Sequence, residues 1–133
     1  DYTQAIASYS KSILLQPNFA DPYNNRSFAK ILNKDYQGAI ADCYTALNLM
    51  GKKPSPIVFN NLGHAHRELD HLDSAFYYFD KAIAAKNNFS QAYFERGIAK
   101  QKINDLTGAC KDWKSASVYG YNDTLHLLEK FCR

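Results

Sequence analysis

The stretch FNNLGHAHRELDHLDSAFYYFDKA, residues 59–82, decides the fold, because its pattern recurs along the chain. Its second half carries Ala75, Phe79 and Ala82, and residues at i, i+4 and i+7 share one face of an α-helix. The same small–bulky–small face recurs at intervals of 34, 36 and 34 residues, in Ala5, Tyr9 and Ser12, in Ala39, Cys43 and Ala46, and in Ala109, Trp113 and Ala116. The spacing predicts four copies of a helix whose small residues admit a close neighbour.

A second helical pattern precedes three of these four copies. Phe59, Gly63 and His66 share a helix face, and the corresponding sets are Tyr23, Ser27 and Lys30, and Tyr93, Gly97 and Lys100. Short polar segments separate the two helices of each unit, at residues 33–35, 69–71 and 104–105. Each unit is therefore predicted to be a helical hairpin, which buries too little surface alone and must stack on its neighbours.

These units resemble the tetratricopeptide repeat, a 34-residue helix–turn–helix unit. The resemblance rests on Phe59, Leu62-Gly63, Ala75, Phe79 and Ala82, and on Tyr93, Gly97, Ala109, Trp113 and Ala116; the preceding unit departs from it at Ser27 and Cys43. It implies an all-α solenoid of about three and a half repeats with a C-terminal capping helix. The expected single domain comprises a half-repeat at 1–18, repeats at 20–53, 56–89 and 90–121, and a cap at 122–133 with Asn122 as its N-cap. The closing run of the chain is also similar to the ends of many bacterial proteins of this family.

Composition and motifs argue against several classes of function. The net charge of +3 is too small to indicate nucleic acid, and no apolar run approaches the ~20 residues that span a bilayer. His64 and His66 lie two residues apart, so they point to different sides of a helix and cannot share a metal ion, while His71 falls in a turn. Because no nucleophile–base pair and no Gly-rich phosphate loop is present, we expect no enzyme activity, no metal and no cofactor.

The resemblance also implies where a partner would bind, because the first helix of each hairpin lines the concave groove in this family. The positions carried over are Asn24, Asn25, Phe28, Asn60, Asn61, His64, Arg67, Gln91, Phe94, Glu95, Ile98 and Lys102. An Asn carboxamide both donates and accepts hydrogen bonds, so Asn25 and Asn61 are expected to face water and to hold a peptide main chain. The family's clamp for C-terminal carboxylates is not expected, because its lysine is absent and Phe28 and His64 stand where it has Asn.

The interpretation that follows is a non-catalytic scaffold that binds a protein or peptide segment in its groove. The alternatives are an RNA-binding helical repeat, for which the groove has too few cations, or the interaction domain of a larger enzyme or secretion component. No small-molecule substrate is evident, and the sequence does not distinguish a cytoplasmic from an exported protein.

The two ends of the chain carry one expectation each. The helix near residues 3–16 lacks a hairpin partner, so its exposed edge is expected to favour self-association or pairing with a missing part. At the other end, Cys110 and Cys132 lie at the same height on two helices expected to be antiparallel, so a disulfide between them is sterically plausible and would favour an exported protein.

Overall fold

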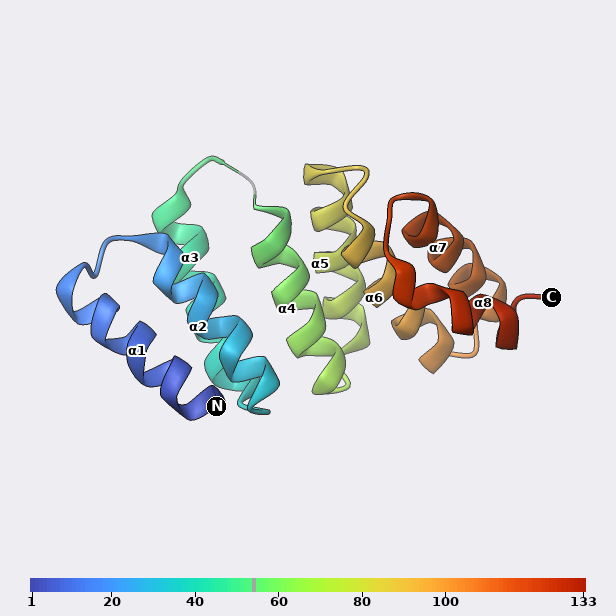
Figure 1. Cartoon of the computed structure of the whole chain (residues 1–133). Coiled ribbons are helices and arrows are strands. Elements are labelled where there is room, and N and C mark those ends of the chain that lie inside the picture. Colours follow the sequence, from blue (N-terminus) through green and yellow to red (C-terminus); the bar gives the residue numbers. More distant parts are fainter. Residues whose placement is uncertain (54) are drawn as a thin grey trace.

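A computed structural model describes residues 1–53 and 55–133, and the described chain is all-α, as predicted (Figure 1). Its helices are α1 (Tyr2–Leu15), α2 (Ala20–Leu32), α3 (Tyr36–Met50), α4 (Pro56–Glu68), α5 (Leu72–Ala85), α6 (Ser90–Lys102), α7 (Leu106–Val118) and α8 (Leu125–Phe131). A short 3₁₀ turn, Asn122–Thr124, precedes α8. The predicted boundary before α4 includes Pro54, which lies outside the described residues, and Pro56 occupies the first turn of α4, as expected.

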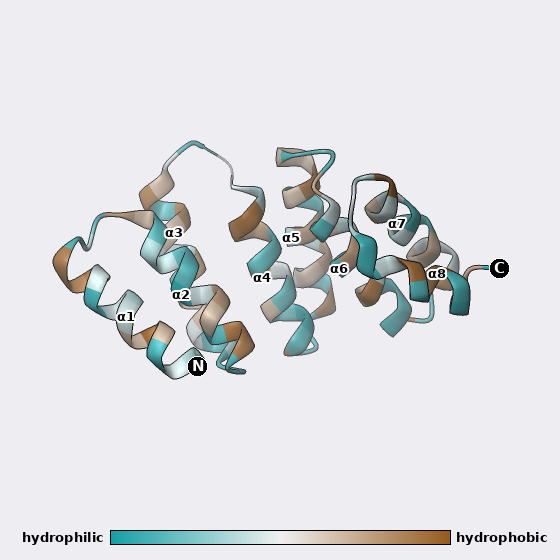
Figure 2. Cartoon of the chain, viewed as in Figure 1, coloured by the Kyte–Doolittle hydropathy of each residue, from teal (hydrophilic) through white to brown (hydrophobic). Residues whose placement is uncertain are grey.

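Three hairpins, α2–α3, α4–α5 and α6–α7, stack in one row (Figure 1). Hydrophilic and hydrophobic residues alternate along the helices, as expected for helices with one buried face (Figure 2). Helix α1 packs against α2 at one end of the row and has no buried residue. Self-association through this edge stays a prediction, which light scattering at high protein concentration tests. None of the described helices has the length and apolarity needed to cross a membrane.

The core consists of the periodic residues that the sequence singled out. All nine members of the three complete sets have an exposed fraction of 0%: Ala39, Cys43, Ala46, Ala75, Phe79, Ala82, Ala109, Trp113 and Ala116. Each bulky member packs on the small residue of its hairpin partner helix, since a Cβ added at Gly63 would lie 2.5 Å from the Phe79 ring and one added at Gly97 would lie 2.4 Å from the Trp113 indole. The predicted close helix crossings are therefore confirmed.

The hairpin turns repeat one backbone geometry. Lys34, Asp70 and Asn104 adopt left-handed conformations with φ of 64°, 62° and 64°. The next residue is the N-cap of the second helix. Asp35 accepts a hydrogen bond from the backbone N–H of Gly38 at 3.0 Å, and Asp105 accepts the equivalent bond at 2.9 Å. In the middle turn His71 occupies this place and makes no side-chain capping bond.

Partly buried ion pairs, which the periodic pattern did not predict, hold two of the three hairpins. The Arg26 guanidinium donates to both carboxylate oxygens of Asp42 at 2.7 and 2.6 Å, and Arg96 donates to Asp112 at 2.8 Å through each of two nitrogens. Such two-point pairs fix the angle between the helices that they join as well as their separation. In the middle hairpin the equivalent positions are Leu62 and Tyr78.

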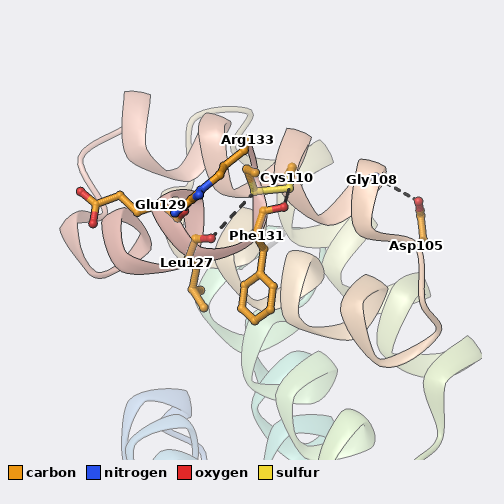
Figure 3. Close-up of a disulfide and its surroundings, with 8 residues drawn as sticks. Asp105, Gly108, Cys110, Leu127, Glu129, Phe131 and Arg133 are labelled. Atoms are coloured by element: carbon orange, nitrogen blue, oxygen red, sulfur yellow. Dashed lines mark hydrogen bonds between the residues drawn. A yellow bond between two sulfur atoms is a disulfide. The ribbon is translucent and has the colours of Figure 1, made fainter.

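The C-terminal cap differs from the prediction at its start. Asn122 is not the N-cap of a helix: it begins the 3₁₀ turn, and α8 starts at Leu125. The reason lies in Thr124, which is fully buried and donates its hydroxyl to the Tyr121 carbonyl at 2.9 Å, a local bond that favours the tight turn. Cys110 of α7 and Cys132 after α8 are joined by a disulfide with their Cα atoms 5.6 Å apart (Figure 3).

Candidate functional site

A pocket of about 370 Å³ opens on the side of the stack formed by the first helices of the hairpins. Its lining residues come from α1, α2, α4 and the start of α6, and they are Tyr9, Asn24, Asn25, Phe28, Ile57, Asn61, Phe89 and Gln91. None of these side chains carries a formal charge at neutral pH. The pocket therefore combines carboxamides, which donate and accept hydrogen bonds, with aromatic and aliphatic surface.

The apolar part of the pocket is open to solvent before anything binds. Phe28 is 44% exposed and Ile57 is 53% exposed, and Asn25 beside them is exposed as well. Covering such apolar surface is favourable by about 25 cal/mol per Å² removed from water.

Sequence reasoning found the amides of this pocket and missed part of its apolar wall. Tyr9, Ile57 and Phe89 were not among the predicted groove residues. The sequence did contain a signal for Ile57, because it precedes Gln91 by 34 residues and so holds the same place in its repeat. Tyr9 was expected only as a packing residue of the edge helix.

Asn61 does not face water, so that expectation is wrong. Its side chain is 5% exposed, and its Nδ2 donates to Asn24 Oδ1 at 3.0 Å and to Ser27 Oγ at 3.4 Å. These bonds cross from α4 to α2, so Asn61 fixes the orientation of the Asn24 amide. Asn60 is 2% exposed, does not line the pocket, and its Oδ1 has no hydrogen-bond partner among the described residues. Of the four asparagines, only Asn25 is an exposed groove residue.

A second group of predicted groove residues forms a charged cluster farther along the same helices. The Arg67 guanidinium donates to a carboxylate oxygen of Glu95 and, at 3.1 Å, to Glu68 Oε1. His64 Nδ1 lies 3.6 Å from Glu95 Oε1. Arg67 is 7% exposed and Glu95 is 6% exposed, so both are buried rather than displayed to a partner. Removing one member of a buried ion pair costs about 3–5 kcal/mol of stability. A ligand that drew Arg67 or Glu95 out of the pair would have to overcome a similar cost.

Burial sets the protonation of His64 within this cluster. Burial lowers the pKa of His64 below its ordinary value of 6.5, and the charge of Arg67 lowers it further, although Glu95 and Glu68 act in the opposite direction. For Glu68, burial alone would raise the pKa, but the hydrogen bond and charge of Arg67 outweigh it and the net pKa is lowered. The folded chain therefore holds a neutral His64 imidazole next to the ionised Glu68 carboxylate near neutral pH.

This arrangement predicts how stability depends on pH. The unfolded chain binds a proton at His64 near pH 6.5, whereas the folded chain resists it, so the stability contribution is present above that pH and is lost as pH falls. Urea unfolding at about pH 7.5 and about pH 5 should show a lower free energy of unfolding at the acidic value. The variant His64→Gln should show a smaller drop in the free energy of unfolding between these two pH values. It should keep part of the pH dependence, because the pKa of His66 is lowered too. An identical loss in both proteins would contradict the assignment to His64.

The remaining predicted groove residues lie away from the pocket. Phe94 stacks on Tyr121 with ring centroids 4.6 Å apart, Ile98 is half-buried, and Lys102 is exposed. None of the three lines the pocket. Over residues 1–53 and 55–133, no cluster of three or more His, Cys, Asp or Glu side chains is placed to hold a metal ion.

Comparison with known proteins matches one unit of the chain to a family model and the whole fold to solved structures. Residues 57–89 match the family model of the tetratricopeptide repeat, and no curated protein matches the chain. Among solved structures, MamA matches with a TM-score of 0.76 and 19% identity, over 90% of this chain and 69% of MamA. Cut9 in its complex with Hcn1 gives 0.83 and 20%, over 94% of this chain and 25% of that one. The first such domain of Spaghetti (RPAP3), bound to the HSP90 peptide SRMEEVD, gives 0.75 and 20%, over 84% and 89%. At these identities the likeness shows the fold.

Proposed function

We propose that this chain, a solenoid of tetratricopeptide repeats, is a binding module that takes a peptide segment into the pocket between α2 and α4. The observation that carries the proposal is the pairing of exposed Phe28 and Ile57 with the exposed amide of Asn25 in one uncharged hollow. An apolar side chain of the segment would lie on Phe28 and Ile57, and its main chain would bond to Asn25. The peptide bound to the similar domain of RPAP3 is consistent with this use of the fold.

The charge distribution favours a particular class of segment. No charged side chain lines the pocket, and Arg67, a predicted groove cation, is buried in its pair with Glu95. An acidic segment such as SRMEEVD, which the RPAP3 domain binds, would find no free cation here. A nucleic acid would lack the cations that its phosphates require. We therefore propose an uncharged segment with one apolar anchor residue.

Asn25→Ala should weaken binding of such a segment by about 0.5–1.5 kcal/mol, the net value of one hydrogen bond. The fold should be unchanged, because the Asn25 side chain is exposed. A partner is first captured with the chain as bait, its contacting segment is mapped with overlapping peptides, and calorimetry then measures the affinity of that peptide. Asn48→Ala is the matched control, since Asn48 is an exposed amide on α3, outside the pocket, and its loss should leave affinity unchanged.

Phe28→Ala supplies the second arm, because it removes apolar contact and leaves the amides in place. It should weaken binding by at least about 1 kcal/mol, as truncation of a central aromatic contact usually does. Equal affinities of the wild type, Asn25→Ala and Phe28→Ala would show that the pocket is not the binding site. Preference for SRMEEVD over an uncharged peptide of equal length, or strongly salt-dependent RNA binding, would overturn the proposed class of ligand.

A further inference from the structure

Two histidines that the sequence interpretation kept apart meet at the turn of the middle hairpin. His66 lies in the last turn of α4, and His71 precedes the first residue of α5. Their Nδ1 atoms are 3.4 Å apart on the exposed side of the turn, where one ring can donate a hydrogen bond to the other. The His66 ring stacks on Tyr78 with an interplanar angle of 8°, which fixes its orientation. His64 and His66 point to different sides of α4, whereas His66 and His71 meet across the turn.

The separation of the two nitrogens fits a shared metal ion. Imidazole nitrogens bind Zn²⁺ at about 2.0–2.1 Å, and two ligands at neighbouring corners of a tetrahedron are then about 3.4 Å apart. A metal ion binds imidazole in its neutral form. Ligation through Nδ1 places the ring proton of His66 on Nε2, which is buried without a hydrogen-bond partner in the described part of the chain.

The other two hairpins show what stands at these positions when there is no histidine pair. The residues equivalent to His71 are Asp35 and Asp105, both of which cap the following helix. The residues equivalent to His66 are Lys30 and Lys100, which form ion pairs with Asp42 and Asp112. The middle hairpin has lost both arrangements, and the missing cap alone is worth about 1 kcal/mol. Among the three described hairpins, the middle one alone places two imidazole rings side by side across its turn.

We propose that His66 and His71 bind a divalent transition-metal ion, of which Zn²⁺ and Cu²⁺ suit imidazole ligands best. The two rings are the protein ligands, and water molecules fill the remaining positions. The Nδ1 atoms of the pair lie on the exposed side of the turn, where solvent has access. The ion joins the end of α4 to the start of α5. Cu²⁺ should bind more tightly than Zn²⁺ at this site.

Isothermal titration calorimetry of the whole chain with Zn²⁺ at about pH 7.5 tests the site. The wild type should bind one ion, and His71→Asn should bind it at least about tenfold more weakly, because the second bond of a chelate forms at high effective concentration. Asn caps a helix as well as Asp does, so this variant should fold. His126→Asn, which removes an exposed histidine of α8, is the matched control and should bind like the wild type.

A second variant and a spectroscopic measurement locate the ion. His66→Gln should weaken Zn²⁺ binding as His71→Asn does, and NMR of the wild type should show Zn²⁺ shifting the ring signals of His66 and His71 but not of His126. Equal affinity in the wild type and His71→Asn would overturn the proposal. So would a loss of binding in His126→Asn, or no saturable binding up to about 1 mM Zn²⁺, the weak end of specific affinities.

Discussion

Replacing Gly63 by Ser should lower the free energy of unfolding by about 1–3 kcal/mol, the usual range for overpacking a filled core. The added Cβ would lie 2.5 Å from two ring carbons of Phe79, whose side chain is 0% exposed and cannot move into solvent. At a helix position with free space around it, replacing glycine by alanine stabilises a protein by about 0.5–1 kcal/mol. The contact with Phe79 therefore reverses the expected sign of the stability change. Urea unfolding measured by circular dichroism gives the change, and Gly63→Leu should cost more than Gly63→Ser.

The chain supplies its own control for this contact. In the α2–α3 hairpin the same two positions hold Ser27 and Cys43, both fully buried, so a small side chain in place of the ring leaves room for a Cβ. Phe79→Cys alone should cost about 3–5 kcal/mol through the cavity that it leaves. In that background Gly63→Ser should cost at least about 1 kcal/mol less than in the wild type, as interacting neighbours do. Equal costs in both backgrounds would show that the ring is not the cause.

The sequence predicted the core well because packing between hairpins repeats with the chain. Phe79 packs on Gly63 as Trp113 packs on Gly97, so each copy supports the interpretation of the other. The turns were predictable for a similar reason, since a short polar segment between two helical patterns has few conformations to adopt.

The candidate site was predicted only in part, because its contacts join different repeats and follow no single period. Asn61 has the same sequence pattern as Asn25, but the two have different neighbours. Asn61 lies against α2, whose Asn24 and Ser27 accept its hydrogen bonds, whereas Asn25 is exposed. Position within a repeat therefore gives the direction of a side chain but not its burial. Arg67 and Glu95 illustrate the same limit, because each was assigned to the groove singly and the two neutralise each other.

Some of the missed structure did leave a trace in the sequence. Arg26 and Arg96 are 70 residues apart, and so are Asp42 and Asp112, which is the sum of two repeat intervals. Comparing the first complete hairpin with the third would have revealed these ion pairs. The middle hairpin hides them because Leu62 stands at the arginine position there, and the same replacement of charged residues brings His66 and Tyr78 together.

Removing the disulfide between Cys110 and Cys132 should lower the free energy of unfolding by about 3 kcal/mol, because the bond closes a loop with a sequence separation of 22 residues. Helix α8 has seven residues, none of them fully buried, and an isolated helix of that length is not stable in water. Its main aromatic contact is Phe131 against Trp113, with ring centroids 6.1 Å apart, and the Phe131 ring points toward the body of the stack (Figure 3). Without the bond α8 should detach first, so amide hydrogen exchange in residues 125–131 should rise more than elsewhere.

The double variant Cys110→Ser/Cys132→Ser and the reduced wild type should give the same result, because the third cysteine takes no part. Cys43 is fully buried, and burial raises the pKa of its thiol to about 12, so it carries almost no reactive thiolate at neutral pH. A reductant should therefore destabilise the wild type by about 3 kcal/mol and leave the double variant unchanged. Titrating the unfolded, unreduced protein with a thiol reagent should find one free thiol. Three free thiols after purification under oxidising conditions, or an equal effect of reductant on both proteins, would refute the role given to this bond.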